Sequence, residues 1–184
     1  RQHISAAKLP LLITAVLLMP LNWLLEAFKW GVLLNRQYST QTLLRGVIAG
    51  VTMGFVTPAR SGEFLGRVLF LNDTDRVRSF YLTAIGGMAQ AVPTYVSGAI
   101  CVALLGSSII QGFEFATGIA IGLATVFIFF YFRFETLNAF IRRLPFLANR
   151  NLIIDKDEIP PQPILFKALA IAVLRYSIYV AQYV

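Results

Sequence analysis

The sequence predicts an all-α protein, a polytopic integral membrane helical bundle that contains a re-entrant helical hairpin. Hydrophobic residues make up 57% of the chain and charged residues 14%, whereas about a quarter of a soluble domain is charged. The mean hydropathy is +0.69. Several apolar runs are long enough to cross a bilayer, which takes about 20 helical residues. These observations together indicate an integral membrane protein.

The first predicted span runs from Leu9 to about Phe28. Pro10 suits the first turn of a helix. Glu26 and Lys29 are three residues apart and could pair on one helix face. Flanking the membrane is the simpler interpretation of both, and lining a path is the alternative. The residues expected to anchor the span at the interface are Trp23, Lys29, Trp30 and Arg36.

Thr42 to Thr57 is a shorter apolar segment with Gly46, Gly50 and Gly54 in a GxxxGxxxG series. This spacing clears one helix face of side chains and predicts close packing with another helix. About 15 helical residues rise only about 22 Å, less than the roughly 30 Å of a bilayer core. The next apolar run, 62–71, is shorter still. A re-entrant hairpin is therefore favoured, and the distribution of positive charges does not exclude a spanning helix instead.

A charged turn joins these two segments and carries Arg60, Glu63 and Arg67. Pro58 ends the first segment because proline lacks an N–H, and Gly62 begins the second. Spacings of three and four residues place the three charges on one helix face. Charges at membrane depth are candidates for functional residues. The alternative is a surface loop with a fortuitous ion pair.

The turn also resembles a family signature. The run Thr57-Pro58-x-Arg60-x-Gly62-Glu63, followed by Arg67, is similar to that of the lysylphosphatidylglycerol synthase transmembrane family, also called flippase-like domain proteins. Trp23…Lys29-Trp30…Leu34 is similar to the family's first aromatic and basic motif. The resemblance spans roughly residues 10 to 105. The chain departs from it at Ala59, where members often have glycine, and at Lys29, where they often have arginine.

The resemblance implies lipid translocation, in which a charged headgroup moves between leaflets. Arg60 and Arg67 would bind a lipid phosphate through charge-assisted hydrogen bonds. Glu63 would hold the arginines or receive a headgroup amine. The candidate substrate-binding residues are Thr57, Lys29, Arg60, Glu63, Arg67 and Gln90. The candidate structural residues are Pro58, Gly62, Gly46, Gly50, Gly54 and Pro93.

The middle of the chain predicts two further spans. After a polar connection over 72–78, a long span over 80–105 should be kinked by Pro93. Gln90 in this span is expected to make a helix–helix hydrogen bond, with a place in a translocation path as the alternative. The uncharged segment 106–112 is assigned to the outside. The span over 113–132 follows, with Gly118 and Gly122 as a packing face.

The last part predicts a cytoplasmic segment and one more span. Arg133, Arg142, Arg143 and Arg150 are expected inside the cell, and 134–147 as an amphipathic surface helix. We divide the chain into a first bundle (1–147), a cytoplasmic linker (148–163), in which Pro160, Pro161 and Pro163 prevent a helix, and the start of a further span (164–184). The last span contains Arg175. Tyr176 and Tyr183 repeat the spacing of Trp23 and Trp30, and Gln182 aligns with Lys29, a weak sign of an internal repeat. Arg1 and Val184 suggest an excerpt of a longer protein.

No catalytic constellation is visible, and we expect no enzyme activity, cofactor or metal site. His3 is the lone histidine, and no HExxH, GxSxG or phosphate-binding glycine loop occurs. The lone Cys101 supports neither a disulfide nor a metal site. The net charge of +7 suits anionic phospholipids rather than nucleic acid. We expect a bacterial inner membrane protein, with a homo-oligomer or a partner membrane protein left open. The alternative function is a non-catalytic membrane scaffold whose charged turn is structural.

Overall fold

The computed structural model describes residues 9–35, 37–58, 62–71, 76–109, 112–136 and 159–183, and these are helical with short connections. No strand occurs in these ranges, so the predicted all-α class is confirmed. The helices are α1 (Leu9–Leu33), α2 (Thr40–Val56), α3 (Gly62–Val68), α4 (Arg76–Ile109), α5 (Phe113–Phe132) and α7 (Gln162–Ala181). Within the described residues, four stretches are long and apolar enough to cross a membrane: Pro10–Leu33, Arg78–Gly106, Phe113–Phe132 and Gln162–Ala181.

α1 continues to Leu33, more than a turn beyond its predicted end. Asn35 then ends it with a φ of 54°, the left-handed conformation that often terminates a helix. The extension places Lys29 and Trp30 inside the bundle, each with 1% of its surface exposed. The prediction that these two residues anchor the span at the interface was therefore wrong. Arg36, the other basic anchor, lies outside the described residues.

α2 and α3 form a tight pair whose backbones touch at glycine. A Cβ added at Gly50 would lie 2.9 Å from the Glu63 carbonyl, and one at Gly66 would lie 2.6 Å from the Ala49 backbone. A side chain at these positions would therefore separate the helices. α3 has seven residues and rises only about 10 Å, far less than a bilayer. The two helices thus form the short hairpin that the sequence predicted.

The hairpin turn is held by the Thr57 side chain. Its Oγ1 atom donates a hydrogen bond to the Met53 carbonyl at 2.9 Å and accepts one from the Gly62 N–H at 2.7 Å. Gly62 has no room for a side chain, because an added Cβ would lie 2.7 Å from the Met53 carbonyl oxygen. The structural role predicted for Gly62 is explained by this contact.

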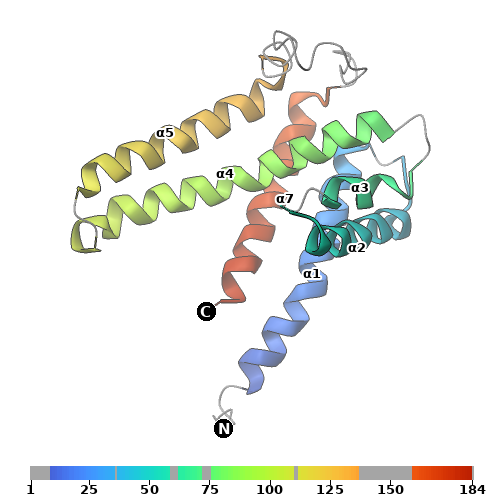
Figure 1. Ribbon diagram of the computed structural model, residues 1–184, viewed down its shortest axis with the longest axis horizontal. Helices are drawn as coiled ribbons and strands as arrows, with labels where there is room; N and C mark the ends of the chain where they lie inside the picture. Colours follow the sequence, from blue (N-terminus) through green and yellow to red (C-terminus); the bar gives the residue numbers. More distant parts are fainter. Residues whose placement is uncertain are drawn as a thin grey trace.

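α4 and α5 lie side by side, and their joined ends form an arm that extends away from α1 and α7, whereas the first half of α4 packs against those two helices (Figure 1). α4 begins at Arg76, so the predicted polar connection over 72–78 is shorter than expected, and Pro93 lies inside this continuous helix. The two helices are joined by the stacked rings of Tyr95 and Phe127, whose centroids are 4.4 Å apart. α5 has the bounds that the sequence predicted.

α7 begins at Gln162, although the prolines before it predicted a linker through residue 163. Pro161 is the N-cap, and proline is tolerated in the first turn because its missing N–H would be unbonded there anyway. α7 packs antiparallel to α1 (Figure 1). Near the C-terminal end of α7, the Gln182 side chain donates a hydrogen bond at 3.4 Å to the Ala15 carbonyl, which is near the N-terminal end of α1. The division of the chain into three parts stays a prediction.

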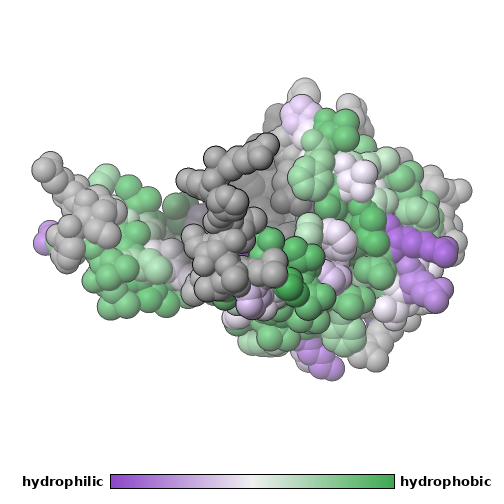
Figure 2. Space-filling view, turned by 90° about the horizontal axis from the view of Figure 1, so that it is seen from below, coloured by the Kyte–Doolittle hydropathy of each residue, from purple (hydrophilic) through white to green (hydrophobic). Residues whose placement is uncertain are grey.

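The protein is held together by a central apolar core and carries apolar side chains outside it. The buried core combines residues of α1, α2, α4 and α7, including Trp30, Val47, Ile85 and Ala168. Large hydrophobic residues such as Leu17 and Phe115 are more than half exposed. Figure 2 shows one face that is mostly hydrophobic where residues are coloured. Exposed hydrocarbon of this extent suits a protein surrounded by lipid.

Candidate functional site

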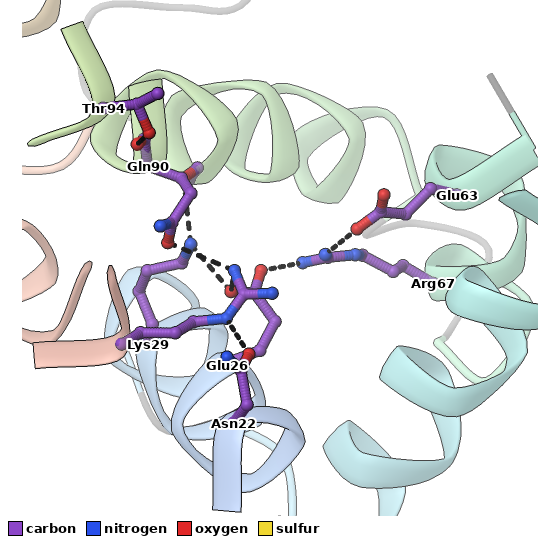
Figure 3. Close-up of polar contacts among 9 residues, drawn as sticks. Asn22, Glu26, Lys29, Glu63, Arg67, Gln90 and Thr94 are labelled. Atoms are coloured by element: carbon purple, nitrogen blue, oxygen red, sulfur yellow. Dashed lines mark hydrogen bonds and ion pairs between the residues drawn. The ribbon is translucent and has the colours of Figure 1, made fainter. Parts of the chain in front are cut away.

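The centre of the candidate site is Glu26 on α1, a carboxylate with 3% of its surface exposed. Three cationic side chains from three helices contact it: Lys29 of α1 at 2.8 Å, Arg67 of α3 at 2.7 Å and Arg175 of α7 at 2.5 Å. Figure 3 shows Glu26 between the labelled Lys29 and Arg67, with dashed contacts to both. Glu26 therefore joins helices that are far apart in the sequence.

Arg67 is the contribution of the short hairpin. Its Nη1 donates to Glu26, and its Nη2 pairs with Glu63 one turn earlier on α3, as the four-residue spacing predicted. Arg67 is 4% exposed, and its Nε has no hydrogen-bond partner among the described residues. The close glycine packing of α2 and α3 sets its position, because the Arg67 Cγ would lie 3.0 Å from a Cβ at Gly50.

Arg175 is held from three sides. Its Nε donates to the Asn22 side-chain oxygen at 2.6 Å, and its Nη1 donates to Glu26 and, at 3.2 Å, to the Gln90 side-chain oxygen. The Gln90 contact connects α4 with α7, which confirms the predicted helix–helix hydrogen bond. The Arg175 side chain is 23% exposed, several times more than that of Arg67. No described residue accepts a bond from its Nη2.

Lys29 is almost fully enclosed by the helices around it. Its Nζ contacts Glu26 and donates to the Gly86 carbonyl of α4 at 3.0 Å. With 1% of its surface exposed, it ties α1 to α4. The Glu26–Lys29 pair predicted as one option is present, but it lies in the interior instead of flanking the membrane.

The cluster has an excess of positive charge. Glu26 and Glu63 contribute two negative charges and Lys29, Arg67 and Arg175 three positive charges, so these five described side chains sum to +1. Burying ions is costly unless they are paired and hydrogen-bonded, and within a membrane such groups face a polar interior. Mutual pairing satisfies most of this requirement, and the five described side chains keep a net charge of +1.

Two cavities adjoin the cluster. The larger, about 490 Å³, is lined by charged residues at one end and by apolar side chains such as Val16, Met19 and Phe55 elsewhere; we call it the Trp23 cavity. The smaller, about 240 Å³, is lined by Thr83, Gly87 and Gln90 of α4; we call it the Thr83 cavity. The residues that line both cavities are Glu26, Glu63, Arg67 and Arg175.

Four of the predicted substrate-binding residues meet in this cluster. They are Lys29, Glu63, Arg67 and Gln90. Thr57 is at the hairpin turn, where both of its hydrogen bonds serve the turn. Arg60 lies outside the described residues. Among the predicted structural glycines, Gly46, Gly50 and Gly54 are buried on α2, as expected of a packing face.

Sequence reasoning missed three members of the cluster. In the sequence, Glu26 has the pattern of a flanking charge, Asn22 has no distinguishing pattern, and Arg175 is only a charge within an apolar segment. The rule that an ionisable residue inside a span is a functional candidate applies to Arg175 as it does to Arg67. That rule alone could have found Arg175 from the sequence.

Comparison with known proteins bears on the same residues. A family model described as "Lysylphosphatidylglycerol synthase TM region" matches residues 1–182. No curated protein and no solved structure matches the chain. The match includes all six helices named above and every residue of the charged cluster. The chain therefore belongs to the lysylphosphatidylglycerol synthase transmembrane family.

Proposed function

We propose that the protein moves lipids with charged headgroups between the leaflets of a membrane. The observation that carries this proposal is the buried cluster of charge +1 beside the partly apolar Trp23 cavity. A phosphodiester headgroup carries one negative charge, so its entry would leave cluster and headgroup neutral together. Neutral pairing reduces the cost of holding charge at membrane depth.

The chemistry of the cavity fits an amphipathic ligand. Arg67 and Arg175 supply planar guanidinium groups, which bind phosphate in a bidentate way. Val16, Met19 and Phe55 supply apolar wall at the same cavity. A lipid has both components, whereas a free anion would gain nothing from the apolar part.

Family membership supports a membrane function related to lipids, and the remaining assignments are part of the proposal. We propose a non-catalytic translocator of phospholipids or other anionic lipids in a bacterial inner membrane. Arg60 stays a predicted substrate-binding residue on the basis of the sequence motif.

A purified full-length protein in liposomes tests the proposal. Labelled phosphatidylglycerol should reach the opposite leaflet faster than in protein-free liposomes, as measured by quenching of the label from outside. Arg67→Lys, which keeps the charge but loses the guanidinium fork, should slow this movement. Arg133→Lys is the matched control, because Arg133 is exposed at the end of α5.

The second candidate is a membrane scaffold or partner subunit in which the cluster only stabilises the fold. The engagement of Arg67 by two carboxylates favours it, since those guanidinium nitrogens already have partners. Lipid movement no faster than in protein-free liposomes would select this candidate. Unchanged movement in a folded Arg67→Lys variant would remove Arg67 from the translocation path.

A further inference from the structure

We propose that Arg175 is an anion anchor shared by the Trp23 cavity and the Thr83 cavity, so that one phosphodiester headgroup can be held from either side of the charged cluster. This inference rests on the proposed lipid function. It names the residue that would stay in contact with the headgroup while the headgroup passes the cluster. It differs from the motif-based expectation, which centres on the arginines of the hairpin.

The two cavities lie at different depths along the α1–α7 pair. On α1, the residues that line only the Trp23 cavity (15–23) precede Glu26, and Lys29, which lines only the Thr83 cavity, follows it. On α7, Tyr179 and Gln182 of the Trp23 cavity follow Arg175. Gln182 contacts Ala15, and Arg175 contacts Glu26. The residues of α1 and of α7 that line the Trp23 cavity therefore lie toward the same end of the α1–α7 pair. The Trp23 cavity therefore extends toward that end, and the Thr83 cavity adjoins α3 and α4.

Four charged residues line both cavities, and they differ in their freedom to bind a ligand. Arg67 donates to two carboxylates and is nearly fully buried. Glu26 and Glu63 would repel a phosphate. Arg175 lines both cavities, has 23% of its side chain exposed, and has an Nη2 with no described partner. It is the cationic group best placed to meet an anion from both sides.

The neutral partners of Arg175 are consistent with this role. Asn22 holds Nε from the Trp23 cavity side, and Gln90 holds Nη1 from the Thr83 cavity side. Amide oxygens fix the guanidinium without cancelling its charge. The Thr83 cavity, about 240 Å³, has room for roughly eight water molecules at about 30 Å³ each, enough for a headgroup without its acyl chains.

Protection of single cysteines from a small neutral maleimide tests the proposal. In a Cys101→Ala background, Val51→Cys reports on the Trp23 cavity and Gly87→Cys on the Thr83 cavity. A Cβ at Gly87 meets no atom within 4 Å, so this variant should fold. The probe is glycerophosphoglycerol, the deacylated headgroup of phosphatidylglycerol, and glycerol is the uncharged control.

One shared anchor makes a quantitative prediction. At a probe concentration about ten times the Kd, total occupancy is about nine-tenths, and the protected fractions at the two cysteines should add up to about that value. Two independent sites would each approach full protection, and a one-sided site would protect only one cysteine. Either result would overturn the proposal.

Substitutions at Arg175 identify the anchor. Arg175→Gln should abolish protection at both cysteines, and Arg175→Lys should weaken it at both while keeping the charge that the fold requires. Lys167→Gln, an exposed change on the same helix, should leave protection unchanged. Protection that survives at either cysteine in the Arg175→Gln variant, or that is undiminished in the Arg175→Lys variant, would show that another residue holds the anion.

A last arm separates this proposal from the proposed function. Dioctanoyl-phosphatidylglycerol has the same headgroup with acyl chains, and it should protect both cysteines at a far lower concentration than glycerophosphoglycerol. Equal potency would mean that the ligand is a soluble phosphodiester, which would refute lipid translocation and leave the shared anchor standing. Lipid movement without protection by either probe would refute the shared anchor and leave lipid translocation standing.

Discussion

Two glycine faces with the same spacing have opposite surroundings in this protein. On α2, Gly46 and Gly50 lie against α3 so closely that an added Cβ would come within 3.0 Å of other atoms. On α5, Gly118 and Gly122 have no atom of the described residues within 4 Å of an added Cβ. The packing face predicted for α5 is thus uncovered in the described part of the chain.

The difference follows from what each helix has to position. The α2–α3 hairpin holds Arg67 against Glu26 in the interior of the helix bundle. Small residues allow the backbones of α2 and α3 to approach closely enough for this contact. The α4–α5 arm contacts itself through large rings such as Tyr95 and Phe127, which need no glycine. A GxxxG pattern therefore indicates that a helix can pack closely against another helix. Whether it does so depends on its surroundings, which for α2 are the charged cluster around Glu26.

The largest expected effect is in the charged region. Glu26→Gln leaves Lys29, Arg67 and Arg175 without their common carboxylate, and breaking a buried pair typically costs about 3–5 kcal/mol. Thermal unfolding of the purified protein in detergent should show a large loss of stability. Glu114→Gln, an exposed change at the start of α5, should have little effect. A Glu26→Gln protein as stable as the parent would mean that the cluster is not needed for folding.

The two glycine faces should respond differently to one methyl group. Gly50→Ala on α2 would place a Cβ 2.9 Å from the Glu63 carbonyl oxygen, and overpacking of this kind costs about 1–3 kcal/mol. Gly118→Ala meets no obstacle and should stabilise α5 by about 0.5–1 kcal/mol, because alanine is the better helix former. An equal change in stability for the two variants in the same unfolding assay would show that the two faces do not differ in how closely they are packed.

Substitutions at Thr57 distinguish a structural role of this residue from a role in substrate binding. Thr57→Val removes the hydroxyl that bonds Met53 and Gly62 and should cost about 1 kcal/mol, whereas Thr57→Ser should retain most of the stability. Lipid movement per folded molecule should be unchanged in both. A transport defect in Thr57→Val at normal stability would restore the predicted substrate role.

A further expected effect concerns the arm. Tyr95→Leu removes the stacking contact with Phe127, and such aromatic pairs contribute about 0.5–1.5 kcal/mol beyond their burial. A double-mutant cycle with Phe127→Leu in the unfolding assay isolates this coupling. A coupling near zero would show that other contacts hold α4 and α5 together.

Local patterns were enough to predict much of the fold. The apolar run over 113–132 is bounded by Gly112 and Arg133, and the helix has those bounds. The short apolar segments around Pro58 predicted the hairpin, and the four-residue spacing predicted the Glu63–Arg67 pair. Helix ends were less predictable at α1 and α7, because a charged residue or a proline ends an apolar run without ending a helix.

The centre of the site could not be predicted, because it depends on tertiary contacts. Glu26 is near the end of its apolar run, where a carboxylate is ordinarily exposed. It is buried here only because cations reach it from α3 and α7, at residues 67 and 175. Neither spacing along α1 nor composition contains that information. The motif contains Glu63 and Arg67, two members of the cluster, but not the Glu26 carboxylate that Arg67 contacts.

The bond from Lys29 to the Gly86 carbonyl has a mechanical consequence for α4. Gly86 is ten residues from the start of this helix at Arg76 and 23 from its end at Ile109, or about 15 Å and about 35 Å along the axis. The tether therefore divides α4 into a short and a long lever arm. A rotation of α4 about this point would displace its Ile109 end, together with the adjoining part of α5, roughly twice as far as its Arg76 end.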